Sequence, residues 1–491
     1  MNRAWKRALR KKYRTLQVYG AAGVAGAAAI GVVGVTNQGT LGENATTTST
    51  LSRLPQLASP IASPHGNPGS AANIAAQEAL HVSSVVSDAK RTFASRFAGA
   101  WIDNSGKSPV TRIMVAGSPN ASTERLFQGR LALSVATKTK VSYVKYTMAQ
   151  LDAYKKTIVD YVTSHFNTPA YRPSGEMIFY IDTKDNSVGI GLTHQDVRFL
   201  AELQKLIPSD ALRVQWIRPA PKPTLSPNTA SQPAGGPGLL PGVNRNSVPF
   251  YKAGLGPMQP FNDGPAQCTT GFTLRGPFYN TYKYYGVTAG HCAHPMDQIN
   301  YTNGTMIGIG TRVYSYGTGG DYYAFVLTKP YQSSYKAKGT ILAETKDAGT
   351  FGFIDNVVGR ASNNDQWAGR SVCASGYITN EITCGTIGWP PGTDVWVGMQ
   401  YFGTLVGNLA CASFTINPGD SGGAVYVPKP GNAGKAAGVI DNTTDKVGAV
   451  LAQPSYGHGS CYTTIDSVLQ GISAHNQGVP AYVVDANGTF S

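Results

Sequence analysis

Cysteine is absent from the first 267 residues of this 491-residue chain, and all six cysteines lie between Cys268 and Cys461. No two of them have the Cys-x-x-Cys spacing, which disfavours a zinc site. An even number of cysteines favours disulfides formed in an oxidising compartment, with zinc binding as the weaker alternative. Six cysteines allow fifteen full pairings, so their spacing does not fix the connectivity. We expect no metal and no cofactor.

Acidic residues are scarce in the N-terminal half. Residues 1–245 contain 28 Lys and Arg against 13 Asp and Glu, a net charge of +15, whereas residues 246–491 contain 13 against 14, a net charge of −1. Seven of the basic residues precede residue 15, a position typical of export signals. The others are scattered and are typical of a solvated surface. The composition therefore disfavours a nucleic-acid partner.

The first segment, residues 1–36, combines a basic flank with an uncharged run from Leu16 to Thr36. This order predicts a secretory signal peptide. The segment lacks twin arginines and a clean small-x-small cleavage site, and the run is long enough to span a bilayer. An uncleaved membrane anchor therefore remains an alternative. We expect an extracellular protein, either secreted or held at the membrane.

Changes in composition divide the rest of the chain. Residues 37–92 begin as a Thr-, Ser-, Asn- and Pro-rich stretch without periodicity and are predicted to be a flexible spacer. Residues 93–218 have the pattern of a compact α+β unit. Residues 219–249 contain eight prolines and predict an exposed linker. The remaining residues, 250–491, form a second region with a different sequence pattern.

Strand and helix patterns alternate in the α+β unit. A helix is expected from about residue 149 to 166, with Thr147 and Gln150 spaced as a capping box, and another after Thr193. No catalytic constellation is evident, and His165 and His194 are interpreted as surface residues. A hairpin turn at 183–186 and strands are predicted at 112–116, 141–146, 177–181, 188–192 and 213–217.

The second region is rich in short apolar runs separated by Gly, Asn and Pro. A helical period occurs near its end, at residues 465–474. Many short strands in about 240 residues predict an all-β barrel or sandwich. Representative strands are expected at 284–288, 322–327, 385–388, 395–399, 423–427 and 436–440.

Three short segments of this region supply His291, Asp321 and Ser421, in that order. A serine hydroxyl is too weakly acidic to attack an amide alone. An imidazole has to take its proton, and a carboxylate has to orient that imidazole and stabilise its charged form. The order His, Asp, Ser is that of the chymotrypsin type and differs from the orders in subtilisins and α/β-hydrolases. We therefore expect His291 as general base, Asp321 as its orienting carboxylate and Ser421 as nucleophile.

The local context supports this assignment. In Gly-Asp-Ser-Gly-Gly, the N–H groups of Gly419 and Ser421 are expected to face a developing oxyanion. Asp321 opens an apolar strand, whereas Asp297, the rival carboxylate, lacks such a strand. The other histidines of this region are interpreted as loop residues on the surface: His294, His458 and His475.

These motifs resemble the secreted bacterial chymotrypsin-like serine endopeptidases of the streptogrisin and α-lytic protease group. The resemblance covers about residues 93–218 and 260–478. Its further motifs are Phe97–Asp103 and Val141–Asp152, which are similar to the group's pro-region, and Val372 to Ile387, which is similar to its central disulfide hairpin. The resemblance implies an all-β catalytic domain of two Greek-key β-barrels, with the triad between them, preceded by an α+β pro-region.

The resemblance also implies how the protein matures and what it binds. The pro-region would assist folding, inhibit the protease and be removed, with maturation near residues 240–255. The partners would be protein or peptide substrates and the chain's own pro-region. The implied disulfides are Cys268–Cys292, Cys373–Cys384 and Cys411–Cys461.

Two departures from the group affect substrate recognition. Cys411 precedes Ser421 by ten residues, a longer gap than usual, which predicts an enlarged loop at the rim of the substrate pocket; Thr415 is a candidate residue of this pocket. The group's substrate-binding Ser-Gly-Gly strand aligns with Asp441, Asn442 and Thr443. A carboxylate there would select basic substrate residues or disturb Asp321, unless the alignment shifts by a residue or two.

A third departure concerns the aspartate before the nucleophile. The group's arginine partner for Asp420 is replaced by Ala374, so another cation is needed, either Arg370 or a newly freed N-terminus. The leading prediction is a secreted serine endopeptidase made as a precursor. The alternatives are a secreted, non-catalytic binding protein with a protease-like fold, and a membrane-tethered protease.

Overall fold

The computed structural model describes residues 82–166, 177–193, 197–216, 251–253, 258–260, 268–279, 281–293, 295–301, 306–332, 337–344, 351–354, 357–375, 382–397, 404–414, 416, 420–428, 445–456 and 459–485. The predicted signal or anchor at 1–36 and the linker at 219–249 lie outside these residues. Within them, no helix is both long enough and apolar enough to cross a membrane.

The first part of the α+β region is built on a three-stranded sheet. Strand β1 (Phe97–Asp103) pairs antiparallel with β2 (Val110–Ala116), which pairs parallel with β3 (Thr139–Val144). A parallel pair needs a crossover connection. Helices α4 (Ala121–Gln128) and α5 (Leu133–Ala136) provide it.

Helix α3 (Val82–Phe93) corrects the predicted end of the flexible spacer, which was placed at residue 92. Its apolar residues recur every three or four positions, and this spacing puts them on one face of a helix. That face is buried against the three-stranded sheet, so the folded region begins at least ten residues earlier than expected. The buried residues of the helix are Val82, Val85, Val86, Ala89 and Phe93.

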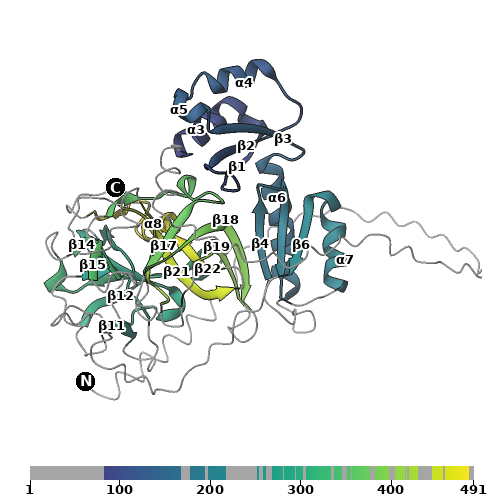
Figure 1. Cartoon of the computed structure of the whole chain (residues 1–491). Coiled ribbons are helices and arrows are strands. Elements are labelled where there is room, and N and C mark those ends of the chain that lie inside the picture. Colours follow the sequence, from purple (N-terminus) through teal and green to yellow (C-terminus); the bar gives the residue numbers. More distant parts are fainter. Residues whose placement is uncertain are drawn as a thin grey trace, which may run out of the picture. The chain divides into compact units, whose positions relative to one another are not determined.

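The second part of the α+β region contains a hairpin and two longer helices (Figure 1). Strand β4 (Met177–Asp182) pairs antiparallel with β5 (Ser187–Leu192), and β5 pairs parallel with β6 (Leu212–Trp216). Helices α6 (Met148–Phe166) and α7 (Val197–Leu206) pack beside these strands in one apolar core. Both predicted helices and the predicted hairpin are confirmed.

The predicted capping box at the start of α6 is also present. The N–H of Thr147 donates to Gln150 Oε1 at 2.9 Å, and the N–H of Gln150 donates to Thr147 Oγ1 at 3.2 Å. These reciprocal bonds satisfy backbone donors that an α-helix leaves unpaired at its first turn.

The sheet of this second part continues into the β-rich region. Strand β4 pairs antiparallel with β18 (Ile382–Val397), so that Ile178 lies opposite Val395. Trp396 and Leu405 of the β-rich region are buried in the same core as α6 and α7. The described residues of the α+β and β-rich regions therefore share one sheet and one apolar core.

A seven-stranded sheet carries the first half of the β-rich region. Its strands follow the order β23-β9-β10-β13-β12-β11-β8. Their bounds are Tyr482–Val483 (β23), Thr273–Phe278 (β9), Thr281–Thr288 (β10), Gly320–Leu327 (β13), Met306–Gly317 (β12), Gln298–Tyr301 (β11) and Met258–Pro260 (β8).

A ten-stranded sheet carries the second half, in the order β17-β20-β21-β22-β19-β18-β4-β5-β6, with β16 paired to β21. The new strands are Ser371–Ser375 (β17), Ala424–Val427 (β20), Asp445–Tyr456 (β21), Gly459–Thr464 (β22), Thr404–Ala412 (β19) and Val357–Arg360 (β16). A smaller sheet joins Phe351–Ile354 (β15), Ala337–Glu344 (β14) and Tyr251–Ala253 (β7). Short 3₁₀ helices lie at Ala94–Arg96, Ser209–Ala211, Gly290–Cys292, Lys329–Tyr331 and Asn363–Asp365.

The two large sheets share an apolar core with helix α8 (Ile465–His475), which the sequence predicted. Tyr285 of the seven-stranded sheet, Tyr426 of the ten-stranded sheet and Ile472 of α8 are all buried in it. This region is mostly β, as expected. The pairings of the described strands give open, mixed sheets, and closure into two Greek-key barrels stays a prediction.

Strand β18 differs from the expectation of two separate strands at 385–388 and 395–399. One strand runs through Pro390 and Pro391, with register shifts against β19 on both sides of them. Proline lacks the N–H that a strand ladder needs, and bulges are where a strand tolerates it. The predicted strand at 436–440 lies outside the described residues.

The three disulfides implied by the resemblance are present: Cys268–Cys292, Cys373–Cys384 and Cys411–Cys461. Cys373 lies directly opposite Cys384 in the pairing of β17 with β18, and Cys411 directly opposite Cys461 in that of β19 with β22. Two disulfides therefore join neighbouring strands of the larger sheet.

Candidate active site

His291 lies in a short 3₁₀ turn, Gly290–Cys292, that follows strand β10. The turn requires glycine at 290, because a Cβ there would lie 2.1 Å from the carbonyl oxygen of Ser315 and 2.9 Å from Asp321 Oδ1. Without a side chain at 290, the chain passes close enough to Asp321 for the N–H of His291 to donate to Oδ1 at 2.9 Å.

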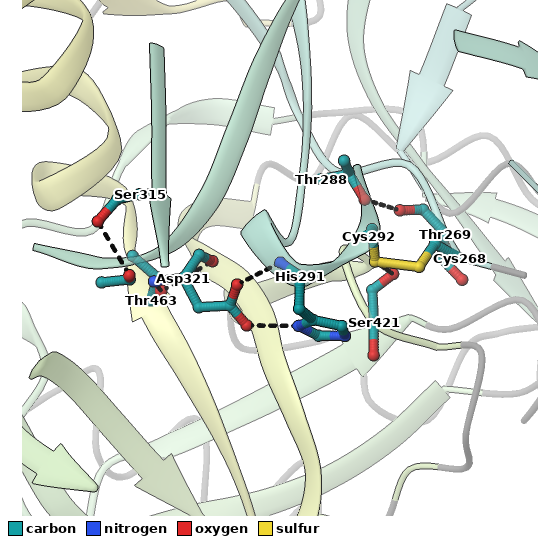
Figure 2. Close-up of polar contacts among 10 residues, drawn as sticks. Cys268, Thr269, Thr288, His291, Cys292, Ser315, Asp321, Ser421 and Thr463 are labelled. Carbon is teal, nitrogen blue, oxygen red and sulfur yellow. Dashed lines mark hydrogen bonds and ion pairs between the residues drawn. A yellow bond between two sulfur atoms is a disulfide. The ribbon is translucent and has the colours of Figure 1, made fainter. Parts of the chain in front are cut away.

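Asp321 is the second residue of strand β13, and its side chain is fully buried. Its carboxylate accepts two hydrogen bonds from His291. One comes from the backbone N–H, and the other joins Oδ2 to ring atom Nδ1 at 2.7 Å (Figure 2). A buried carboxylate needs such partners to remain charged. The pairing fixes the orientation of the imidazole ring. Because Nδ1 is bonded to Asp321, Nε2 is the ring nitrogen that this pairing does not use.

The electrostatics of His291 follow from this pairing. Burial by itself lowers the pKa of the imidazole, but the negative charge of Asp321 and the hydrogen bond to it outweigh that effect. The pKa of His291 is therefore raised above its ordinary value of 6.5. The raised pKa means that Asp321 stabilises the protonated form of the His291 ring.

Ser421 lies in the turn before strand β20, which belongs to the ten-stranded sheet. Gly422 follows it with φ +90°, where a side chain would be strained. A Cβ at 422 would also lie 2.0 Å from Thr288 Oγ1 and 2.2 Å from the carbonyl oxygen of Thr269. The N–H of Thr269 donates to the carbonyl oxygen of Ser421 at 2.7 Å, which ties this turn to the seven-stranded side.

The Cys268–Cys292 disulfide lies close to both His291 and Ser421 (Figure 2). The sulfur of Cys292 is 3.8 Å from the carbonyl oxygen of Ser421, and both sulfurs lie within 4.8 Å of a ring nitrogen of His291. In Figure 2 the Ser421 side chain lies next to the His291 ring. No hydrogen bond joins the two side chains, both of which are described. Such contacts often tighten only when substrate binds.

The same three residues, Cys268, His291 and Cys292, have the spacing of metal ligands. Their donor atoms already have other partners, however. The two sulfurs are bonded to each other, and His291 Nδ1 is bonded to Asp321. Thiolates, not disulfide sulfurs, are the ligands that metals bind. The cluster is therefore best interpreted as a disulfide beside the His291–Asp321 pair.

Several residues expected at the site lie outside the described residues: Gly419, Thr415, Asp441, Asn442 and Thr443. The oxyanion donors and the substrate pocket therefore stay predictions. Among the surface histidines, His165 and His475 are exposed as expected. The three others, His194, His294 and His458, lie outside the described residues.

Asp420 and Arg370 are both buried. The cation that pairs with Asp420, expected to be Arg370 or a newly freed N-terminus, stays a prediction.

Sequence reasoning missed Thr463, which contacts the backbone of Asp321, and Thr269, which contacts Ser421. Both are fully buried. Thr463 follows Cys461 by two residues in β22. The predicted disulfide therefore indicated this part of the chain, but it did not indicate the contact of Thr463 with Asp321. A threonine in a β-strand is too common to signal such a role by itself.

No protein-family model matches the chain, and no curated protein matches it in sequence. Among solved structures, the neighbours are bacterial chymotrypsin-like serine proteases. A glutamic acid-specific serine protease, described as using a novel histidine triad in substrate binding, is 19% identical, covering 47% of this chain and 100% of its own, with TM-score 0.32.

Two further neighbours give similar values. Nocardiopsis protease is 21% identical over 43% of this chain and 93% of its own, with TM-score 0.30. Thermobifida fusca protease A is 19% identical over 46% of this chain and 96% of its own, with TM-score 0.31. At these identities and TM-scores, the function of the site has to be inferred from this chain's own residues.

Proposed function

We propose that this chain is the precursor of a secreted serine endopeptidase that cleaves peptide bonds through an acyl-enzyme. The observation that carries the proposal is the double hydrogen bond from His291 to the buried Asp321 carboxylate. It gives the imidazole one orientation and raises its pKa. The side chain of Ser421 lies next to the imidazole ring (Figure 2).

In the first step, Ser421 Oγ attacks the carbonyl carbon of the substrate while its proton passes to His291 Nε2. The charge on the resulting imidazolium is stabilised by Asp321. The carbonyl oxygen becomes an oxyanion that the N–H groups of Ser421 and Gly419 would bind. Loss of one such donor typically costs about 2.7–4 kcal/mol of transition-state stabilisation.

The tetrahedral intermediate then collapses. The C–N bond breaks, the leaving amine takes the proton from His291, and an ester to Ser421 remains. A water molecule gives a proton to His291 and attacks this ester, which releases the acid and restores the serine. His291 thus serves as base and then acid in each half of the reaction, without a metal or cofactor in any step.

The α+β region, predicted as residues 93–218 and extended to Val82 by helix α3, is proposed to be the pro-region. Support comes from its pairing with the β-rich region, in which β4 adds to the edge of β18 and buries Trp396. In this role it would assist folding, inhibit the protease and be removed after cleavage near residues 240–255. N-terminal sequencing of the secreted form should find its first residue within that interval.

Casein hydrolysis tests the proposed reaction. Full-length wild type and Ser421→Ala are expressed with their N-terminal segment, and both culture medium and cells are assayed. The proposal predicts activity in the medium for wild type and none for the variant. Activity that stays with the cells would instead indicate a membrane-tethered protease. A folded, processed wild type that cleaves nothing would favour the non-catalytic binding protein.

A further inference from the structure

Thr463 makes two hydrogen bonds to the backbone of Asp321. Its Oγ1 accepts from the N–H of Asp321 at 2.8 Å and donates to the carbonyl oxygen of the same residue at 3.1 Å (Figure 2). Thr463 is fully buried. One hydroxyl therefore satisfies both main-chain polar groups of the residue whose carboxylate holds His291.

These two residues belong to different sheets. Asp321 is on β13 of the seven-stranded sheet, and Thr463 is on β22 of the ten-stranded sheet. Ser421 precedes β20, which is also a strand of the ten-stranded sheet. The contact thus ties the acid and base on one sheet to the sheet that carries the nucleophile.

Thr463 is itself held firmly. It lies opposite Leu409 of β19 and Val450 of β21, two residues beyond Cys461, which is bonded to Cys411. Its methyl group packs against Gly320, where an added Cβ would lie 2.8 Å from Thr463 Cγ2 and where φ is +117°. Both branches of the threonine side chain are therefore used at this junction.

We propose that Thr463 is a positioning residue for the reaction, an inference that rests on the proposed function. It acts on His291 through Asp321. By fixing the backbone of Asp321 across the sheet junction, it sets where the carboxylate meets the two donors of His291, and hence the place of the ring relative to Ser421. Displacements of about 1 Å can cost about a hundredfold in rate.

The test compares kcat, KM and the pH dependence of peptide hydrolysis for full-length chains that have matured normally, with active sites titrated. Thr463→Val keeps the shape and loses the hydroxyl. We expect kcat to fall about tenfold to a hundredfold, with KM within about twofold. The acid limb of kcat/KM should move to lower pH, because a less fixed Asp321 raises the pKa of His291 less. Thr463→Ser should restore most of kcat and the limb.

Thr464→Val is the matched control. Thr464 is the next residue and caps helix α8, where its hydroxyl accepts from the N–H of Ser467 at 3.4 Å. This variant should lower Tm but leave kcat and the pH limb unchanged. If Thr463→Val does not fold, Thr463→Ser and Thr463→Ala decide, since they differ by the hydroxyl alone. The serine variant should be at least tenfold more active than the alanine variant.

Equal activity of that pair, or a Thr463→Val variant with wild-type kcat and pH limb, would overturn the inference. A second readout separates it from the proposed function. In full-length Ser421→Ala labelled with ¹⁵N-histidine, the Nδ1 proton of His291 should resonate far downfield, and Thr463→Val should shift it or broaden it. This result would stand even if wild type cleaved no peptide, whereas an unmoved signal would contradict the role of Thr463.

Discussion

Lys155 and Asp394 form an ion pair between helix α6 and strand β18, with 2.7 Å from Nζ to Oδ2. Their side chains are only 13% and 16% exposed. Lys155 also donates to the carbonyl oxygen of Gly392. The proposed pro-region is therefore attached to the β-rich region by a largely buried charge, next to the strand pairing of β4 with β18.

Removal of this charge should weaken that attachment. We expect Lys155→Ala to lower the unfolding free energy of the uncleaved Ser421→Ala precursor by about 2 kcal/mol, because Asp394 loses a charged partner in a poorly solvated place. Lys156→Ala is the control, since Lys156 pairs with Asp160 on the exposed side of the same helix. It should cost less than about 0.5 kcal/mol. Equal losses in urea unfolding would contradict the role given to Lys155.

The raised pKa of His291 predicts a pH dependence. The neutral ring is the base, so kcat/KM should rise with pH through the pKa of His291, with its midpoint above pH 6.5. Asp321→Asn removes the attraction that raises this pKa. Its midpoint should move to lower pH, and kcat should fall about 10⁴-fold. The same midpoint in both proteins would show that Asp321 does not set the pKa of His291.

Gly290 is expected to tolerate no side chain. Gly290→Ala places a Cβ against the carbonyl oxygen of Ser315 and beside Asp321, so either the strand or the carboxylate must move. We expect a loss of about 1–3 kcal/mol in stability, together with a large loss of titratable active sites. Gly388→Ala is the control, because nothing lies within 4 Å of an added Cβ there. Retention of full active-site titre by Gly290→Ala would argue against this packing.

Local patterns in the sequence predicted the elements whose cause is local. The helix α6 and its cap follow from residues within one turn of each other, such as Thr147 and Gln150. The strand before His291 and the strand after Asp321 were likewise evident from short apolar runs. Helix α3 was missed because its valines are interspersed with serines and follow a low-complexity stretch.

Contacts between distant segments were not evident from the sequence. The pairing of Ile178 with Val395 joins strands more than 200 residues apart, and no side chain in either strand specifies that partner. The hydrogen bonds between Thr463 and Asp321 were likewise not evident from the sequence, because they depend on how two sheets pack together. The disulfide partners came from the resemblance, as spacing alone left fifteen pairings open.

The most direct test of the account is covalent labelling of the mature protein with a fluorophosphonate probe, followed by peptide mapping. A fluorophosphonate reacts with a serine that a neighbouring base has activated. We expect a single label on Ser421 in wild type and a strongly reduced rate of labelling in His291→Ala. A mature wild type that remains unlabelled at Ser421, or labels equally fast without His291, would contradict it.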